Sequence, residues 1–281
     1  MLMRLAVLLA LCAAAPAAWA GGAYRALLGH GPFPSADEGD RQQAGDLRYM
    51  RFVRNRDEPF GSRPDGSGRA GNLVGLSLAE SFGGRAGLLA DGMALSDQSL
   101  GQTFRMSRMD YLLGAAFIDE AWRFQVDREE ALPLDQGGPG WRAWDARLSL
   151  ALGSKGEKPQ RGPAKTKTGE SRPWRGALTL GWFFHNNTMP TRADGTGLAF
   201  LRYAGEFEYR LLSGRLRLSG AADALTDERR RRFAPSGLGL KLGVGVALDR
   251  FELFLTRESQ DVLDGPGWNA AWLMGTRVSF P

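Results

Sequence analysis

Apolar side chains alternate with polar or small ones at the carboxyl end of the chain. In the segment 268–281, one row of alternate residues is mostly apolar and consists of Ala270, Trp272, Met274, Thr276, Val278 and Phe280. The residues between them form a second row of side chains that are smaller and more polar on average. Because successive side chains of a β-strand point to opposite faces, this pattern predicts a strand with one oily face and one polar face.

The same alternation recurs along most of the chain. It is clearest in 199–211, where an apolar row that contains Tyr203 alternates with a charged row that contains Arg202 and Glu206. The pattern predicts about twelve strands. We expect them at 47–54, 72–82, 84–91, 106–117, 119–127, 142–152, 175–185, 199–211, 214–223, 237–248, 250–257 and 268–280.

The predicted connections alternate between short and long. Tight turns are expected at 82–84, 118–119, 212–214 and 248–250, whereas the intervening loops are longer, polar and rich in Gly, Pro and Asp. Outer-membrane barrels combine short periplasmic turns with long outer loops in this way. The connection 153–173 departs from the pattern, because it should be short but is long and basic. Either it is a disordered excursion, or the strand count is wrong by one nearby.

Together these features predict an all-β fold, namely an antiparallel transmembrane β-barrel of about twelve strands over residues 47–281. The alternative is a soluble β-sandwich or a lipocalin-like barrel, whose strands alternate equally well. Three observations favour the membrane: the number of strands, the tryptophans near strand ends, and a charged second row that would make a poor soluble core.

The first residues have the features of a cleaved export signal. Residues 1–20 combine a positive charge at Arg4, an apolar run shorter than a spanning helix, and the small-x-small ending AWA. We expect a signal peptide cleaved after Ala20, export to the outer membrane of a Gram-negative bacterium, and a periplasmic lead or plug segment at 21–46. The only cysteine, Cys12, leaves with the signal, so the mature chain can form no disulfide or thiolate site.

Charge and residue chemistry exclude several classes of function. Loss of Arg4 lowers the formal net charge from +5 to +4, an excess too small to indicate nucleic acid as a partner. With two distant histidines and no cysteine in the mature chain, we expect no metal site, and no motif indicates a cofactor. The expected partners are outer-membrane lipid, lipopolysaccharide and the barrel assembly machinery, and the oligomeric state stays open.

If the apolar rows face lipid, the charged rows line the lumen. By the same alternation these rows include His185, and they carry both signs of charge, with bases somewhat ahead of acids. The lumen then holds either ion pairs that close it, or water in which the basic excess favours anions. The residues expected to line it and to bind solute are Arg202, Glu206, Arg210, Arg215, Arg217, Lys241 and Arg277.

A second basic cluster falls in a predicted outer loop. It consists of Arg229, Arg230, Arg231 and Arg232. Guanidinium groups suit the phosphates of lipopolysaccharide, which is the expected contact. The alternative is a solvated, charged loop tip.

His185 is the one side chain nominated as a catalytic base. It ends the segment LTLGWFFH and resembles the histidine of outer-membrane lipid hydrolases, in which a serine follows two positions later. Asn187 stands at the place of that serine, and an amide is no nucleophile.

Two segments, 37–52 and 254–280, resemble the start and the last hairpin of the lipid A 3-O-deacylase family. The resemblance implies a twelve-stranded outer-membrane barrel. The Asn-Asp pair of that family appears here as Gly31-Pro32, and no histidine falls in the middle strands where its general base lies. The resemblance therefore implies a barrel without the catalytic residues of that family.

The expected function is passive passage or binding of small hydrophilic solutes, with a preference for anions, through a charged lumen. One alternative is a lipid A or phospholipid acyl hydrolase of the outer membrane. The other is a non-catalytic barrel that serves the structure of the envelope.

Overall fold

The predicted signal peptide at 1–20, most of the predicted lead at 21–46 and nearly all of the connection 153–173 lie outside the residues that the structure describes. No helix in the described part of the chain is long and apolar enough to cross a membrane. The structure, a computed structural model, describes residues 42–55, 61–64, 67–82, 85–98, 105–119, 122–135, 140–153, 174–189, 191, 197–212, 215–263 and 268–280.

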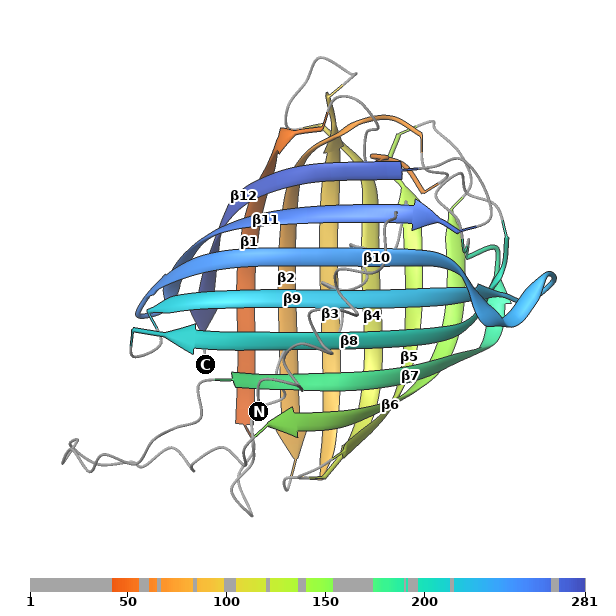
Figure 1. The fold of residues 1–281 in the computed structure, drawn as a ribbon, viewed down its shortest axis with the longest axis horizontal. Helices are drawn as coiled ribbons and strands as arrows, with labels where there is room; N and C mark the ends of the chain where they lie inside the picture. Colours follow the sequence, from red (N-terminus) through yellow and green to blue (C-terminus); the bar gives the residue numbers. More distant parts are fainter. Residues whose placement is uncertain are drawn as a thin grey trace.

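The strands form a closed antiparallel barrel. In Figure 1 the strands of the near wall run across the direction of the strands in the far wall. Each strand pairs with the next one along the chain, and β1 pairs with β12, which closes the sheet. A closed sheet satisfies its backbone polar groups without water, as a bilayer requires. The strands are β1 (Gln42–Arg54), β2 (Ala70–Phe82), β3 (Ala86–Asp97), β4 (Met106–Ile118), β5 (Trp122–Pro133), β6 (Trp141–Gly153), β7 (Trp174–Asn187), β8 (Ala199–Leu211), β9 (Leu216–Asp227), β10 (Arg231–Leu248), β11 (Phe251–Val262) and β12 (Trp268–Phe280).

The strand positions confirm the pattern read from the sequence. β8 and β12 begin and end at the expected residues. β1 begins at Gln42, inside the segment expected to be a periplasmic lead. β6 and β7 are hydrogen-bonded neighbours, so no further barrel strand lies between them.

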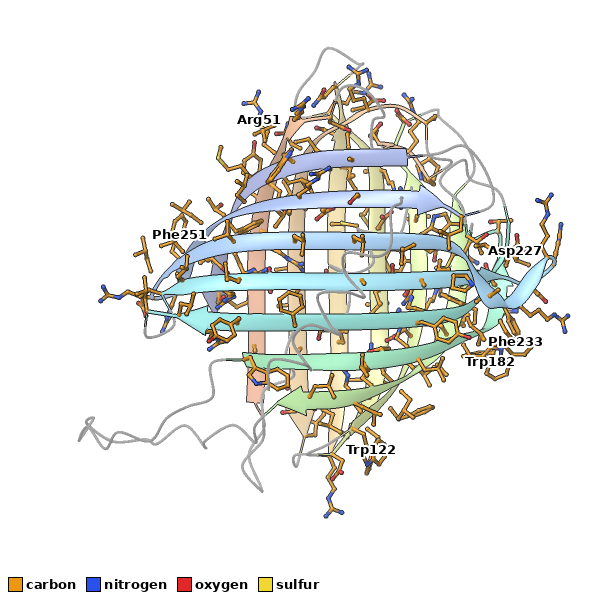
Figure 2. The ribbon with its side chains drawn as sticks, in the orientation of Figure 1. Arg51, Trp122, Trp182, Asp227, Phe233 and Phe251 are labelled. Atoms are coloured by element: carbon orange, nitrogen blue, oxygen red, sulfur yellow. The ribbon has the colours of Figure 1, made fainter. Side chains whose placement is uncertain are left out.

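The outer face of the barrel is an apolar belt. Large apolar side chains on this face stay exposed, for example Leu178 and Trp182, which are 52% and 50% exposed. Figure 2 shows Trp122 and Trp182 pointing away from the barrel wall. A soluble sandwich or lipocalin-like barrel would bury one such row, so this belt identifies a transmembrane barrel.

Parts of the inner face are also apolar, contrary to the expectation that apolar rows face only lipid, and one of these parts includes β3. On β3, Leu89, Met93 and Leu95 point inward and are buried, while the small residues Gly92 and Ala94 lie in the outward row. The inward residues belong to a cluster that fills one side of the lumen. Its other members, from β1, β2, β4 and β12, are Met50, Phe52, Ala70, Leu73, Ala79, Leu112, Ala271 and Leu273.

The two ends of the barrel differ in their connections. At the end where β1 begins and β12 ends, short turns join β2 to β3, β4 to β5, β8 to β9 and β10 to β11. In two of these turns Leu212 and Asp249 have φ values of 51° and 58°, the left-handed backbone of tight hairpin turns. We call this end periplasmic and the opposite end extracellular, because outer-membrane barrels have short turns toward the periplasm.

Leu180 lies in the apolar belt at the middle of β7 and is 49% exposed. The substitution Leu180→Arg places a charge in hydrocarbon, so we expect the free energy of unfolding from lipid vesicles to fall by about 2–4 kcal/mol. The matched control is Leu211→Arg at the periplasmic end of β8, which should cost about 0–1 kcal/mol. Equal effects in urea titrations of the two variants would contradict a hydrocarbon-facing belt.

Candidate functional site in the barrel lumen

A network of charges crosses the middle of the lumen. Asp127 of β5 lies directly opposite Asp145 of β6 in the register of the two strands. Two carboxylates in this position repel each other. Arg147 lies between them, with its Nε 2.6 Å from Asp145 and 3.0 Å from Asp127. This arginine therefore allows β5 and β6 to pair in the observed register.

Arg202 of β8 extends the network. Its guanidinium makes two contacts with Glu129, at 2.8 and 3.1 Å, and lies 3.5 Å from Asp145 and 3.7 Å from Asp223. Arg147 also binds Glu129, so that one carboxylate joins the two arginines. The central network is defined as Asp127, Glu129, Asp145, Arg147, Arg202 and Asp223.

Gly181 of β7 makes room for the central network. It lies between Arg147 and Arg202 in the register of β6, β7 and β8. A Cβ atom at Gly181 would lie 3.2 Å from the Cβ of Arg202, which is tighter than most such contacts. The missing side chain therefore lets both arginines reach the same carboxylates.

The central network is buried. The side chains of Arg147 and Arg202 are each 3% exposed, and that of Glu129 is 1% exposed. An ion that leaves water costs several kcal/mol, which its partners must offset. Carboxylates outnumber guanidinium groups here, so each arginine serves more than one acid. Among the described residues, no group of three or more Asp, Glu, His or Cys side chains is placed to hold a metal ion.

Charges in the periplasmic half of the lumen are more accessible to solvent. Glu252 of β11 accepts a hydrogen bond from Arg217 at 3.0 Å and another from Arg277 at 3.2 Å. Arg210 pairs with Glu208 at 2.5 Å. The side chains of Arg210, Arg277 and Arg217 are 45%, 29% and 22% exposed, and we call these three the periplasmic arginines.

The seam between β1 and β12 brings two arginines together. Arg48 lies directly opposite Arg277. Arg48 is neutralised by Asp46 at 2.7 Å and by Asp91 of β3 at 3.1 Å, and Arg277 is neutralised by Glu252 of β11. Because like charges in this position repel, the pairing of β1 with β12 depends on these carboxylates.

A loop segment is fastened at the extracellular end of the lumen. Residues 61–64 lie between β1 and β2, and the inward-facing Arg108 of β4 donates a hydrogen bond to the carbonyl oxygen of Arg63 at 3.3 Å. The Arg63 side chain lies 3.1 Å from Asp97, at the end of β3, and 2.9 Å from Asp135, just after β5. The extracellular latch is defined as Arg63, Asp97 and Asp135.

The two halves of the lumen differ in exposure. Inward side chains toward the extracellular ends of the strands are buried, among them Phe52, Leu95, Arg108 and Glu258. Solvent reaches the periplasmic arginines at the other end. Among the described residues, inward side chains are therefore more accessible to solvent toward the periplasmic end than toward the extracellular end.

Most residues expected to line the lumen do face inward. Arg215 is an exception, because β9 begins only at Leu216 and Arg215 lies in the exposed turn before it. Solute binding by the inward residues stays a prediction. Those that face inward are Arg202, Glu206, Arg210, Arg217, Lys241, which pairs with Glu258 at 3.1 Å, and Arg277.

His185 faces outward, contrary to its expected place in the lumen row. Between β6 and β7 the register passes from Trp144 opposite His185 to Asp145 opposite Phe183, so Phe184 is the extra residue of a bulge. An extra residue in one strand turns the residues beyond it to the other face. His185 is consequently exposed beside Trp144 on the outer wall. A catalytic role for it stays a prediction.

The basic cluster at 229–232 belongs to the hairpin of β9 and β10, which projects from the barrel in Figure 1. Arg229 and Arg230 form its exposed turn. Arg231 and Arg232 already belong to β10, which begins before the expected position and has an irregular register there. The guanidinium of Arg232 lies 5.7 Å from the ring centre of Phe200. Contact with lipopolysaccharide stays a prediction.

Sequence reasoning misses part of the lumen. Glu129 and Glu258 lie beyond the expected ends of β5 and β11, although continued alternation after Asp127 would have indicated Glu129. With such residues included, acids outnumber bases among the described inward side chains of the strands, so the expected basic excess is wrong. The acids are Asp46, Asp91, Asp110, Asp127, Glu129, Asp145, Glu206, Glu208, Asp223, Glu252 and Glu258, and the bases are Arg48, Arg108, Arg123, Arg147, Arg202, Arg210, Arg217, Lys241 and Arg277.

Comparison with known proteins yields barrels of low similarity. No family model and no curated protein matches the chain. The solved KdgM porin is 8% identical, covers 85% of this chain and 99% of its own, and has a TM-score of 0.47. The NanC porin is 7% identical, covers 83% of this chain and 98% of its own, and has a TM-score of 0.49. Outer membrane phospholipase A from Escherichia coli is 13% identical, covers 84% of this chain and 92% of its own, and has a TM-score of 0.47. Similarity at this level assigns no function, and the resemblance to lipid A 3-O-deacylases stays a prediction.

The substitution Arg147→Ala removes the arginine that lies between Asp127 and Asp145. We expect the free energy of unfolding to fall by about 3–5 kcal/mol, because a buried charge then lacks its partner. Arg85→Ala, in the exposed turn between β2 and β3, is the matched control and should stay within about 0.5 kcal/mol of the original protein. Urea unfolding in vesicles measures both variants, and equal stabilities would show that the central network does not hold β5 and β6 together.

Proposed function

We propose that the protein is an outer-membrane barrel that passes or binds small hydrophilic solutes in its charged lumen. The observation that carries this proposal is an apolar outer belt around an inner face of charged side chains. Buried ion pairs are often no more stabilising than apolar side chains of similar volume. A purely structural barrel therefore has no need for the charges, and the apolar cluster beside β3 illustrates how such a lumen can be filled.

The accessible charges favour anions. Although acids outnumber bases among the described inward side chains, the periplasmic arginines Arg210, Arg277 and Arg217 are 45%, 29% and 22% exposed. Their partners Glu208 and Glu252 are only 15% and 10% exposed. A solute that enters the lumen from the periplasmic end meets guanidinium groups first, and these pair well with carboxylate and phosphate groups.

Passage across the membrane requires the extracellular half to open, and the extracellular latch is the part suited to this. Arg63 holds the carboxylates of Asp97 and Asp135 near each other, and both side chains are largely buried. Without the arginine these two carboxylates repel each other. Release of the latch loosens residues 61–64, which keep the hydrogen bonds that Ser107 and Arg108 donate to the carbonyl oxygens of Ser62 and Arg63. The central network then limits the width of the path.

Planar-bilayer recordings of the purified barrel test this function. We expect small conductance steps for the original protein and larger or more frequent steps for Arg63→Ala, because loss of the latch loosens the attachment of residues 61–64. Arg85→Ala is the control without change. If both the original barrel and Arg63→Ala insert in folded form and stay silent, the proposal is overturned.

The same recordings test the preference for anions. In a KCl gradient, Arg217→Glu should shift the reversal potential toward cation selectivity, because it reverses a charge among the periplasmic arginines. Arg257→Glu makes the same change on the outer face of β11 and should leave the reversal potential unchanged. Equal shifts would place the solute path elsewhere.

One observation favours a second candidate function, acyl hydrolysis of lipid A or phospholipid. His185 faces lipid near the extracellular end of β7, where an outer-leaflet lipid can reach it. Hydrolysis also needs a nucleophile, and the nearest hydroxyl along the chain, that of Thr188, donates to the carbonyl oxygen of Gly140 at 3.3 Å. Mass spectrometry of membrane lipids tests this candidate: acyl loss that disappears in His185→Ala supports it, and an unchanged acyl pattern removes it.

A further inference from the structure

We propose a binding site for a lipid phosphate on the outer wall of the barrel, near the extracellular ends of β4, β5 and β6. It consists of Tyr111, Arg128, Glu130 and Arg142, which we call the outer-wall cluster. Its ligand is a phosphate group of an outer-leaflet glycolipid such as lipid A. The inference does not rest on passage of solutes through the lumen.

All four side chains of the outer-wall cluster face away from the lumen. Tyr111 of β4 lies opposite Glu130 of β5, and Glu130 lies opposite Arg142 of β6. Arg128 is two positions before Glu130 and therefore lies on the same face. Its partner in the register of β4 is Leu113, which is exposed in the apolar belt. Three neighbouring strands thus contribute to one outward polar cluster.

Glu130 holds the two arginines side by side. One of its oxygens accepts a hydrogen bond from Arg128 at 2.7 Å and the other from Arg142 at 2.9 Å, while the Tyr111 hydroxyl donates to the same carboxylate. The Glu130 side chain is 5% exposed, whereas that of Arg142 is 50% exposed. The carboxylate therefore lies beneath the guanidinium groups and positions them from the wall side.

The outer-wall cluster has capacity left for an anion. Two guanidinium groups share one carboxylate, which leaves a net positive charge. Each guanidinium has five N–H donors, and Arg128 and Arg142 each donate to Glu130 through one terminal nitrogen, Nη2. Phosphate offers several acceptor oxygens and matches the planar fork of arginine. The cluster thus fits an anion that approaches from the outer surface.

The position of the cluster along the barrel selects a lipid as the source of that anion. Along β6, Arg142 is followed toward the barrel centre by the outward residues Trp144, Leu148 and Leu150, all exposed on the outer face. Tryptophan marks the boundary between hydrocarbon and headgroups in outer-membrane barrels. Arg142 lies one outward position beyond this boundary, at the level of the lipid phosphates.

The neighbouring strand β7 continues the polar face. His185 lies opposite Trp144, and Asn187 lies opposite Arg142, so both share the outward face of the cluster. A headgroup with sugar hydroxyls beside its phosphate fits such a broad polar surface, with its acyl chains along the apolar belt below. The site accounts for the outward polar residue at His185 through binding rather than catalysis.

Native mass spectrometry of the purified barrel, titrated in detergent with bisphosphorylated lipid A, tests the site. We expect bound lipid A on the original protein and a loss of affinity of about tenfold or more in the double variant Arg128→Gln/Arg142→Gln. The matched control is Arg51→Gln/Arg257→Gln, which changes two exposed, outward arginines on β1 and β11 and should bind as the original protein does. Glu130→Gln keeps both arginines but removes the group that positions them, and an intermediate loss is expected.

Two further probes identify what is recognised. Dephosphorylated lipid A should bind as weakly to the original protein as lipid A binds to the double variant. Undiminished binding by the double variant, an equal loss in the control, or equal binding of dephosphorylated lipid would overturn the proposal. Displacement of lipid A by inorganic phosphate would show that the site binds the free anion, and it would overturn the proposal that the ligand is a lipid. Conductance of the double variant should match the original barrel, so failure here is distinguishable from failure of the lumen proposal.

Discussion

The structure depends on the matching of charges that a closed sheet takes out of water. Among the described residues the register places like charges face to face three times: Asp127 against Asp145, Arg48 against Arg277 and Arg210 against Arg217. Such pairs are unfavourable alone, and each is neutralised by an opposite charge, in part from a strand beyond the pair. The central network and the seam thus join strands that share no backbone hydrogen bond. These side-chain contacts link hairpins that are not neighbours in the sheet.

The surroundings also decide which residues occupy the outer face of the barrel. In the middle of the barrel the outward row is apolar because it meets hydrocarbon, and charges are confined to the inside. Toward the extracellular end the strands extend past the hydrocarbon, and outward charges appear at Arg128, Glu130 and Arg257. On β5 the consecutive residues 127–130 are all charged and alternate between the two faces, so that a lumen network and a surface cluster lie back to back.

The middle of the barrel could be predicted from the sequence, whereas its extracellular rim could not. In β8 and β12 one face is oily and the other polar, so alternation gives both ends of each strand. Past the hydrocarbon both faces of β5 and β11 are polar, and alternation disappears although the strand continues. On β3 the row of large apolar side chains faces inward. A prediction that assumes a water-filled lumen places this row on the wrong face. The bulge that turns His185 outward and the distant contacts of Arg63 leave no periodic signal in the chain.

The seam has a consequence for the order in which the barrel assembles. In an unfinished sheet that lacked β3 or β11, Arg48 and Arg277 would meet at the closing edge with Asp46 present but without Asp91 or Glu252 to offset them. Premature closure into a smaller ring is therefore disfavoured by repulsion between two guanidinium groups. The charges at the first and last strands therefore favour the pairing of β1 with β12 in a sheet that already contains β3 and β11.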